Sequence, residues 1–235
     1  MRESDFRNAI MKNADLYRAT LLDSRFEKAD LTGANLKAIK VSDQCQFDKA
    51  ILVDAIVEDV DLTRADFSKA NISGAHFNRS LLGESDFSKA TVDRASFVSC
   101  NLIRADFSKV LLKDVNFSGA GLSRAIFDGA EFENVNLTGA DLSLTAFNDV
   151  DLSKTQLVKV SFAQSRLKNM NFNKFDLTGA VFDKSRITRS SMEGAKLVGA
   201  SFFDAEAIEK ISFQEAEMEK SVFDGAYVYK CIFDK

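Results

Sequence analysis

The sequence predicts an all-β solenoid, in which short extended segments turn a corner every five residues and stack coil upon coil. Two observations lead to this prediction. An apolar residue, called here the centre, recurs every five positions along the 235 residues, and phenylalanine occupies many of these centres at intervals of 20. An α-helix cannot keep such residues on one face, because five residues turn it by about 500°. A long strand fails as well, because its side chains alternate with a period of two.

The five-residue unit has a fixed internal order. Residues 65–69 read Ala-Asp-Phe-Ser-Lys, and residues 105–109 repeat them letter for letter. A small residue stands two positions before the centre in 41 of the 46 units. We expect the centre and this small residue to point inward, and the intervening Asp or Asn to point out. Glycine is frequent two positions after the centre, where a type II turn needs a positive φ.

The spacing of the phenylalanines sets the size of one coil. A step of 20 residues equals four units, so the sequence predicts a four-sided coil and about 11.5 coils for 46 units. A second column, Phe77, Phe97 and Phe117, is expected on the opposite wall, which would fill the interior and leave no lumen for a ligand. The first column is the predicted core ladder: Phe6, Phe26, Phe47, Phe67, Phe87, Phe107, Phe127 and Phe147.

The five-residue step is interrupted twice by one extra residue, near 42–46 and near 203–207. The phenylalanine columns cross these places with a spacing of 21, from Phe26 to Phe47 and from Phe202 to Phe223. Each extra residue is therefore expected to bulge outward while the inner columns continue. Such a bulge is either a tolerated insertion or the mark of a contact site.

This pattern of a small residue, Asp or Asn, and then Leu or Phe resembles the pentapeptide-repeat family over essentially the whole chain. The resemblance implies a right-handed quadrilateral parallel β-helix, here as a single domain of residues 1–235. Some members of that family are acidic, dimeric DNA mimics that bind type II topoisomerases and protect against quinolones. The resemblance therefore offers one functional alternative, DNA gyrase as the partner.

Composition argues against several protein classes. The net charge of −4 is not that of a nucleic-acid-binding protein. No apolar run approaches the roughly 18 residues of a membrane span, and the repeat begins too close to Met1 for a signal peptide. We therefore expect a cytoplasmic protein that binds neither membranes nor nucleic acid directly. The three cysteines, Cys45, Cys100 and Cys231, occupy the small position of the repeat and are expected to be small buried hydrophobes rather than ligands.

No catalytic set, cofactor site or metal site is visible in the sequence. The sole histidine, His76, precedes Phe77 at an outward position and is interpreted as a surface residue. Asp66, Asp86 and Asp106 are expected to stack beside a row of lysines: Lys49, Lys69, Lys89 and Lys109. These rows predict a lattice of salt bridges, with a cation-binding row of carboxylates as the alternative.

The C-terminal coils carry the two candidate contact surfaces. Residues 204–224 hold seven acidic and two basic residues, a net charge of −5; this acidic tip comprises Asp204, Glu206, Glu209, Glu215, Glu217, Glu219 and Asp224. Apolar residues also occupy outward positions of the last coil: Val222, Tyr227, Tyr229 and Ile232. Because the end of a solenoid exposes unpaired backbone and core, we expect end-to-end pairing into a homodimer, with a self-capped monomer as the alternative.

Together these observations predict a non-enzymatic protein-interaction module whose outer walls bind another protein. A DNA mimic that binds DNA gyrase is the second hypothesis, which the acidic tip and the expected dimer favour. The remaining walls are balanced in charge, and one-residue bulges do not replace the longer projecting loops of the quinolone-resistance members.

Overall fold

The structure, a computed structural model, describes residues 3–234 as a β-solenoid of about ten turns. This confirms the predicted fold class, with slightly fewer turns than the repeat count suggests. No helix among the described residues is long and apolar enough to cross a membrane. The chain divides into two compact units, unit 1 (Met1–Val135) and unit 2 (Asn136–Lys235). The single domain of residues 1–235 stays a prediction.

Most extended segments are single bridges, and the longer ones form eleven short strands in the described part of the chain. The sheets run in the orders β1-β2, β3-β4, β5-β7 and β11-β10-β9-β8-β6. The strands are β1 (Thr20–Leu21), β2 (Lys40–Val41), β3 (Leu111–Lys113), β4 (Glu131–Glu133), β5 (Val135–Asn136), β6 (Ala146–Asn148), β7 (Thr155–Gln156), β8 (Arg166–Lys168), β9 (Arg186–Thr188), β10 (Ala207–Glu209) and β11 (Val228–Tyr229).

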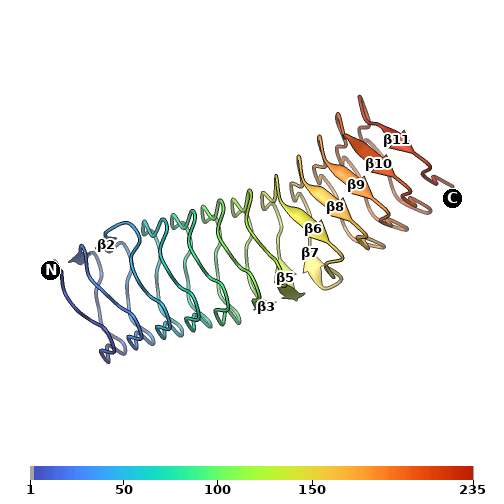
Figure 1. Cartoon of the computed structure of the whole chain (residues 1–235). Helices are drawn as coiled ribbons and strands as arrows, with labels where there is room; N and C mark the ends of the chain where they lie inside the picture. Colours follow the sequence, from blue (N-terminus) through green and yellow to red (C-terminus); the bar gives the residue numbers. More distant parts are fainter. Residues whose placement is uncertain (1–2, 235) are drawn as a thin grey trace. The chain divides into compact units, whose positions relative to one another are not determined.

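The pairing register confirms four units per turn. All pairings are parallel, and the bridges Asp66–Asp86 and Asp86–Asp106 each join residues 20 apart. The four centres of a turn give four walls, which we name A to D in chain order. Wall A contains the Phe6 column, and walls B, C and D begin at Met11, Leu16 and Leu21 respectively. Figure 1 shows the successive turns of each unit side by side.

The interior is filled by the residues that the repeat assigns to it. Phe26, Phe47, Phe67, Phe87, Phe107 and Phe147 have exposed fractions of 0%. Rings one turn apart stack nearly parallel, as in Phe67–Phe87, where the centroids lie 4.9 Å apart and the planes differ by 2°. Rings from wall C meet them edge to face, as in Phe67–Phe77 at 5.5 Å and 86°. These two arrangements are the favourable ones for aromatic pairs, and they occupy the axis of the solenoid.

The corners have a left-handed backbone whether or not glycine is present. Glycines two positions after the centre have the expected positive φ, for example 68° at Gly74. Non-glycine residues at the same position adopt it too, for example 58° at Lys69 and 59° at Leu144. This conformation costs an L-residue roughly 1–2 kcal/mol. The turn geometry is therefore imposed by stacking against neighbouring turns and is not limited to the glycine positions.

Asp or Asn before the centre accompanies short strands, although Ile51, Ile56 and Leu81 at this position also form only single bridges. Asp66 accepts a hydrogen bond on Oδ1 from the backbone N–H of Ser68 at 2.8 Å, and Asp86 and Asp106 bind Ser88 and Ser108 in the same way. Such side-chain turns compete with strand pairing. None of the six three-residue strands among the described residues begins with Asp or Asn. The six longer strands thus begin with Leu, Glu, Ala or Arg at this position.

Both predicted bulges are present, and they differ in position. In the first, the positive φ falls on Gln44, three residues after Val41, so the extra residue precedes the turn. In the second, Asp204 keeps the positive φ, so the extra residue follows the turn. Glu206 is exposed there while Ala205 and Ala207 are buried. The pairing accordingly shifts to a spacing of 21, from Arg186 to Ala207.

Candidate functional surfaces

No group of three or more His, Cys, Asp or Glu side chains within residues 3–234 is arranged to hold a metal ion. His76 is exposed, as expected, and its backbone bridges Ile56 and Ser96 in the neighbouring turns.

Two of the three cysteines are buried as the sequence indicates, but the expectation is wrong for Cys231, which is only half-buried in the last described turn. Cys45 and Cys100 are buried free thiols, and burial raises the pKa of each to about 12. The Cys100 thiol donates a hydrogen bond to the carbonyl oxygen of Phe77 at 3.0 Å. A thiol with so high a pKa is not a nucleophile near neutral pH. Both residues are structural.

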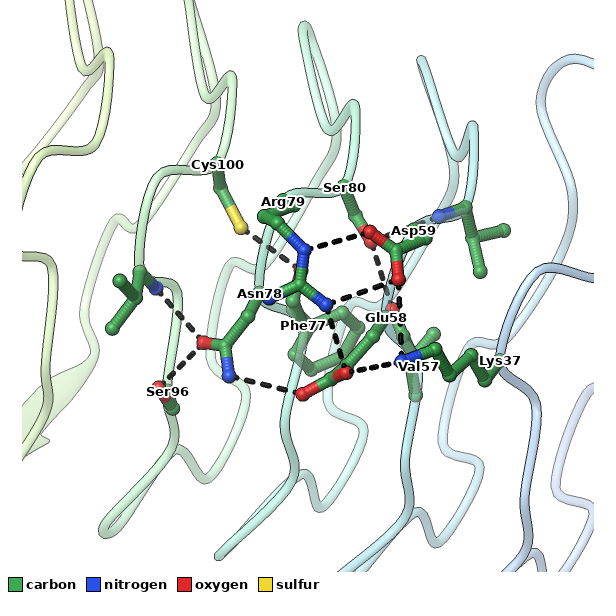
Figure 2. A network of polar contacts seen from close by, with 12 residues as sticks. Lys37, Val57, Glu58, Asp59, Phe77, Asn78, Arg79, Ser80, Ser96 and Cys100 are labelled. Carbon is green, nitrogen blue, oxygen red and sulfur yellow. Dashed lines mark hydrogen bonds and ion pairs between the residues drawn. The ribbon is translucent and has the colours of Figure 1, made fainter.

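The densest polar network lies in unit 1 and is centred on Glu58 (Figure 2). Lys37 Nζ lies 3.1 Å from Glu58 Oε2 and 3.4 Å from Asp59 Oδ2. Arg79 binds the same two carboxylates, at 3.0 Å and 2.8 Å. Asn78 donates to Glu58 Oε1 at 3.2 Å and accepts from the Ser96 hydroxyl at 2.7 Å. These residues join successive turns of one wall and its corner.

This network is a structural clasp. The Glu58 side chain is only 18% exposed; burial opposes its ionisation, but hydrogen bonds from Lys37, Asn78 and Arg79 outweigh that effect and leave its pKa lowered. The Arg79 guanidinium also lowers the pKa of Asp59. Two cations saturate two carboxylates, so little capacity remains for an external ligand.

The first bulge opens a shallow depression in the surface of unit 1. Val41, Asp43, Asp61, Thr63 and Arg64 line it. Arg64 forms a two-pronged ion pair with Asp43, with Nε 3.0 Å from Oδ1 and the second contact between Nη2 and Oδ2. Ser42 anchors the bulge by donating to Asp23 Oδ1 at 2.7 Å. The ion pair between Arg64 and Asp43 thus occupies polar groups that line the depression.

The predicted salt-bridge lattice of Asp66, Asp86 and Asp106 is wrong. These carboxylates accept backbone N–H groups, as described above, and none of them forms an ion pair with a lysine in the part of the chain that the structure describes. In the lysine row, Lys49 pairs with Asp48 at 3.3 Å. The physical reason is the place of these lysines at the corner: Asp30 and Asp176 accept the same kind of backbone hydrogen bond and still pair with Lys12 and Lys196, which do not stand at a corner.

The acidic tip surrounds the solenoid and does not form one patch. Glu206 precedes β10 on wall A, and Glu209 is the last residue of that strand. Glu217 bridges Lys196 on wall C, and Val222 bridges Ser201 on wall D, next to Asp224. Glu215 occupies a corner with φ of 57°. The run of charge is therefore distributed over several walls.

The apolar residues of the last turn are also divided among walls. Tyr227 and Tyr229 lie together on wall A, with ring centroids 6.5 Å apart. Val222 lies on wall D, and Ile232 bridges Ser212 on wall B. All four are exposed, with fractions from 42% to 58%. They border the C-terminal end together, but only the two tyrosines share a face.

Sequence reasoning missed a basic surface in unit 2. Residues 152–203 contain nine basic and three acidic residues, a net charge of +6. Arg166 and Lys168 on β8 and Arg186 on β9 are exposed on wall A, and none of them has an ion-pair partner within residues 3–234. Shallow depressions beside them are lined by Asn148, Thr188 and Glu206. The local charge excess was the signal that could have revealed this surface.

Comparison with known proteins supports the fold. A family model described as a pentapeptide repeat region matches residues 45–130 and 125–202, and a model of pentapeptide repeats in eight copies matches residues 1–37. No curated protein sequence matches the chain.

Solved structures share the architecture at low sequence identity. A trypsin-treated variant of QnrB1, a plasmid-mediated fluoroquinolone resistance protein, is 24% identical, with 77% of this chain and 88% of that chain covered and a TM-score of 0.58. HetL, involved in heterocyst differentiation regulation in the cyanobacterium Nostoc sp. strain PCC 7120, is 21% identical, with coverages of 96% and 91% and a TM-score of 0.32. The family matches extend over most of the sequence, and the chain belongs to the pentapeptide-repeat family.

Proposed function

We propose that this protein is a non-enzymatic interaction module whose outer walls bind another protein. The observation that carries the proposal is the contrast between inside and outside. The axis is filled by stacked rings such as Phe67 and Phe87, so a small molecule has no interior site. The walls, in contrast, present exposed cations in unit 2 that have no carboxylate partner among the described residues, and such groups suit a partner of opposite charge.

Affinity capture with a matched pair of variants tests this proposal. The bait is the full chain, compared with Arg166→Ala/Arg186→Ala and with Lys69→Ala/Lys109→Ala as a control of equal charge change in unit 1. A protein retained by wild type and by the control, and lost with the unit 2 variant, supports the proposal. Equal recovery with all three baits, or turnover of a substrate by the purified protein, contradicts it.

The second candidate is a DNA mimic that binds DNA gyrase and gives quinolone protection. The net charge of −5 in residues 204–224 favours it, because a protein that occupies a DNA-binding surface must present negative charge. The net charge of +6 in residues 152–203 weighs against it. A gyrase supercoiling assay separates the candidates: inhibition, or rescue from a quinolone, at micromolar protein supports the mimic. Absence of both effects removes it.

We also propose that the C-terminal turns form a homodimer. The support is the pair of exposed aromatic side chains in the last described turn, Tyr227 at 58% and Tyr229 at 44%. Light scattering on wild type and on Tyr227→Asp tests this: a dimer converted to a monomer supports the proposal, and two monomers contradict it.

A further inference from the structure

The outer surface of the five-stranded sheet in unit 2 has an ordered sequence of chemical groups. We call this surface the sheet face; it is formed by β6, β8, β9, β10 and β11 on wall A (Figure 1, yellow to red). From β8 to β11 its outward side chains change from cations through carboxylates to aromatic rings. The groups are Arg166 and Lys168 on β8, Arg186 and Thr188 on β9, Glu206 and Glu209 at β10, and Tyr227 and Tyr229 on or beside β11.

Two cations of the sheet face stand in direct register, and Glu206 is the carboxylate that borders the same depression as these cations. Arg166 and Arg186 are Cα partners in the parallel ladder, so their backbones lie about 4.8 Å apart. Like charges opposite each other on neighbouring strands destabilise a sheet. Neither arginine has an ion pair in the described part of the chain, although arginine readily forms paired hydrogen bonds with carboxylates. A negatively charged partner on this face would remove the repulsion.

The other end of the same face offers the complementary groups. Glu206 is the exposed residue of the second bulge and Glu209 follows Ile208 on β10. Neither carboxylate has an ion-pair partner within residues 3–234. Tyr227 and Tyr229 are 58% and 44% exposed, and Lys230 Nζ already lies 5.1 Å from the centroid of Tyr229. These rings therefore accept cations.

These groups come together when the sheet faces of two copies are opposed across a two-fold axis. The axis runs parallel to the strands and passes between β9 and β10. That axis reverses the stacking order and keeps the strand direction, so β9 of one copy faces β10 of the other, and β8 faces β11. The outward residues that precede each centre then face one another. Arg166 meets the partner copy's Tyr227, and Arg186 meets the partner copy's Ala207 and the adjacent Glu206. After the centre, Lys168 meets Tyr229 in the same way. Because the axis is two-fold, every contact forms twice.

We propose that a second copy of this chain docks on the sheet face, side by side and with reversed stacking direction. The partner is inferred to be a second copy because a single face carries both the cations and the carboxylates and tyrosine rings that bind cations. The inference rests on the proposed homodimer and specifies its surface, which is the side of the C-terminal turns and not their end. Val222 and Ile232, which lie on walls D and B, take no part.

The expected dimer is weak and sensitive to salt. Four strands about 4.8 Å apart and about 10 Å long give a contact of roughly 20 Å by 10 Å, well below the area of a stable protein interface. Its exposed charge pairs are screened over about 8 Å at physiological ionic strength. Dissociation at micromolar concentrations, and a further shift toward monomer in molar salt, are therefore expected.

Charge reversal tests the proposal in the full chain by sedimentation equilibrium from about 1 to 500 μM. Arg166→Glu/Arg186→Glu makes the face acidic, and Glu206→Arg/Glu209→Arg makes it basic. Each variant alone is expected to raise the dimer dissociation constant at least tenfold. A one-to-one mixture of the two is expected to restore a heterodimer at least as stable as the wild-type dimer. Lys69→Glu/Lys109→Glu, in unit 1, is the charge-matched control and leaves the dimer unchanged.

The outcomes separate this face from the other proposals. Circular dichroism melts of each variant verify that it is folded. A wild-type dimer that survives both charge reversals but dissociates with Val222→Asp/Ile232→Asp overturns the sheet face and keeps an end-to-end dimer. A monomer at every concentration overturns both dimers, while the interaction module is still tested by the capture experiment. Binding of a 20-base-pair DNA duplex by wild type, lost in the Arg→Glu variant with no change in mass, assigns the face to nucleic acid and also overturns the proposal.

Discussion

Unit 1 satisfies many of its charged side chains internally, whereas unit 2 leaves most of its cations exposed and unpartnered. In unit 1 the network around Glu58 joins Lys37, Asp59 and Arg79, and Arg104 binds Glu84 at 3.1 Å. In unit 2 the ion pairs among residues 136–234 are Lys196–Asp176 at 3.8 Å and Lys220–Glu219 at 3.9 Å. The same repeat therefore supports a self-satisfied surface in one unit and a surface suited to binding in the other.

Wall A differs between the units for a reason visible in the repeat. In unit 1 its outward aspartates accept backbone N–H groups and leave isolated bridges. In unit 2 alanine or arginine replaces them, and strands β6, β8, β9 and β10 run for three residues each. On wall A of unit 2, alanine or arginine before the centre thus coincides with longer strands and exposed cations, and the buried centres beneath change from phenylalanine to Leu167, Ile187 and Ile208.

The largest effect is expected in the core, where the units should be alike. Phe87→Ala in unit 1 and Phe182→Ala in unit 2 each remove a fully buried ring that stacks on a neighbour at 4.9 Å. Each is expected to lower the free energy of unfolding by about 3–5 kcal/mol, measured by urea denaturation. Phe203→Ala, at a 41% exposed position, is the control with little effect. If only one of the two variants lowered the free energy of unfolding by less than about 1 kcal/mol, the interiors of the two units would not be equivalent.

Corner glycines should separate backbone strain from local crowding. Gly139→Ala in unit 2 places a Cβ with no atom within 4 Å, at a φ of 67°; strain alone should cost about 1–2 kcal/mol. Gly74→Ala in unit 1 has nearly the same φ, 68°, and in addition crowds Asp54 Oδ1. We expect a larger loss of unfolding free energy there, about 2–3 kcal/mol. Adding Asp54→Ala should remove the excess; an unchanged difference would show that crowding is not its cause.

Acid should weaken unit 1 through the Glu58 network. The folded pKa of Glu58 is lowered from an ordinary value of 4.5, so its stabilising contribution is present above pH 4.5 and is lost as the pH falls through the lowered pKa. Glu58→Gln should therefore flatten the fall in unfolding free energy with decreasing pH. Urea denaturation at several pH values measures this slope. Glu219→Gln, an exposed position in unit 2, serves as the control, and an equal slope in both variants would contradict the role of the network.

The smallest effect is expected for an exposed ion pair of the first bulge. Arg64 and Asp43 are 48% and 47% exposed, so Arg64→Ala should lower the free energy of unfolding by less than about 1 kcal/mol. Arg166→Ala in unit 2, which removes an unpaired cation, should change it by no more than about 0.5 kcal/mol. Thermal denaturation compares the two. A loss of several kcal/mol with Arg64→Ala would mean that the ion pairs of unit 1 are needed for folding, and would sharpen the contrast between the units.

Sequence reasoning reached the fold because the repeat couples each residue to one place in the coil. The spacing from Phe47 to Phe67 predicts the turn length, and the burial of small residues such as Ala65 follows from their position. It failed for the aspartate row, since whether Asp66 binds a lysine or its own backbone depends on side-chain conformation. It also treated Val222, Tyr227 and Ile232 as one surface, although they lie on three walls.

The four-sided coil, its filled aromatic axis and the places of both bulges can be deduced from the order of residues alone. These features follow from periodicity, because inward positions recur at fixed steps and require apolar side chains of matching size. Which outward residues become neighbours depends on how the turns stack. Arg166 and Arg186 are 20 residues apart and come into register through parallel pairing, and Glu206 is exposed because the chain bulges there. Surface contacts depend on stacking, so the candidate binding face emerged only in three dimensions.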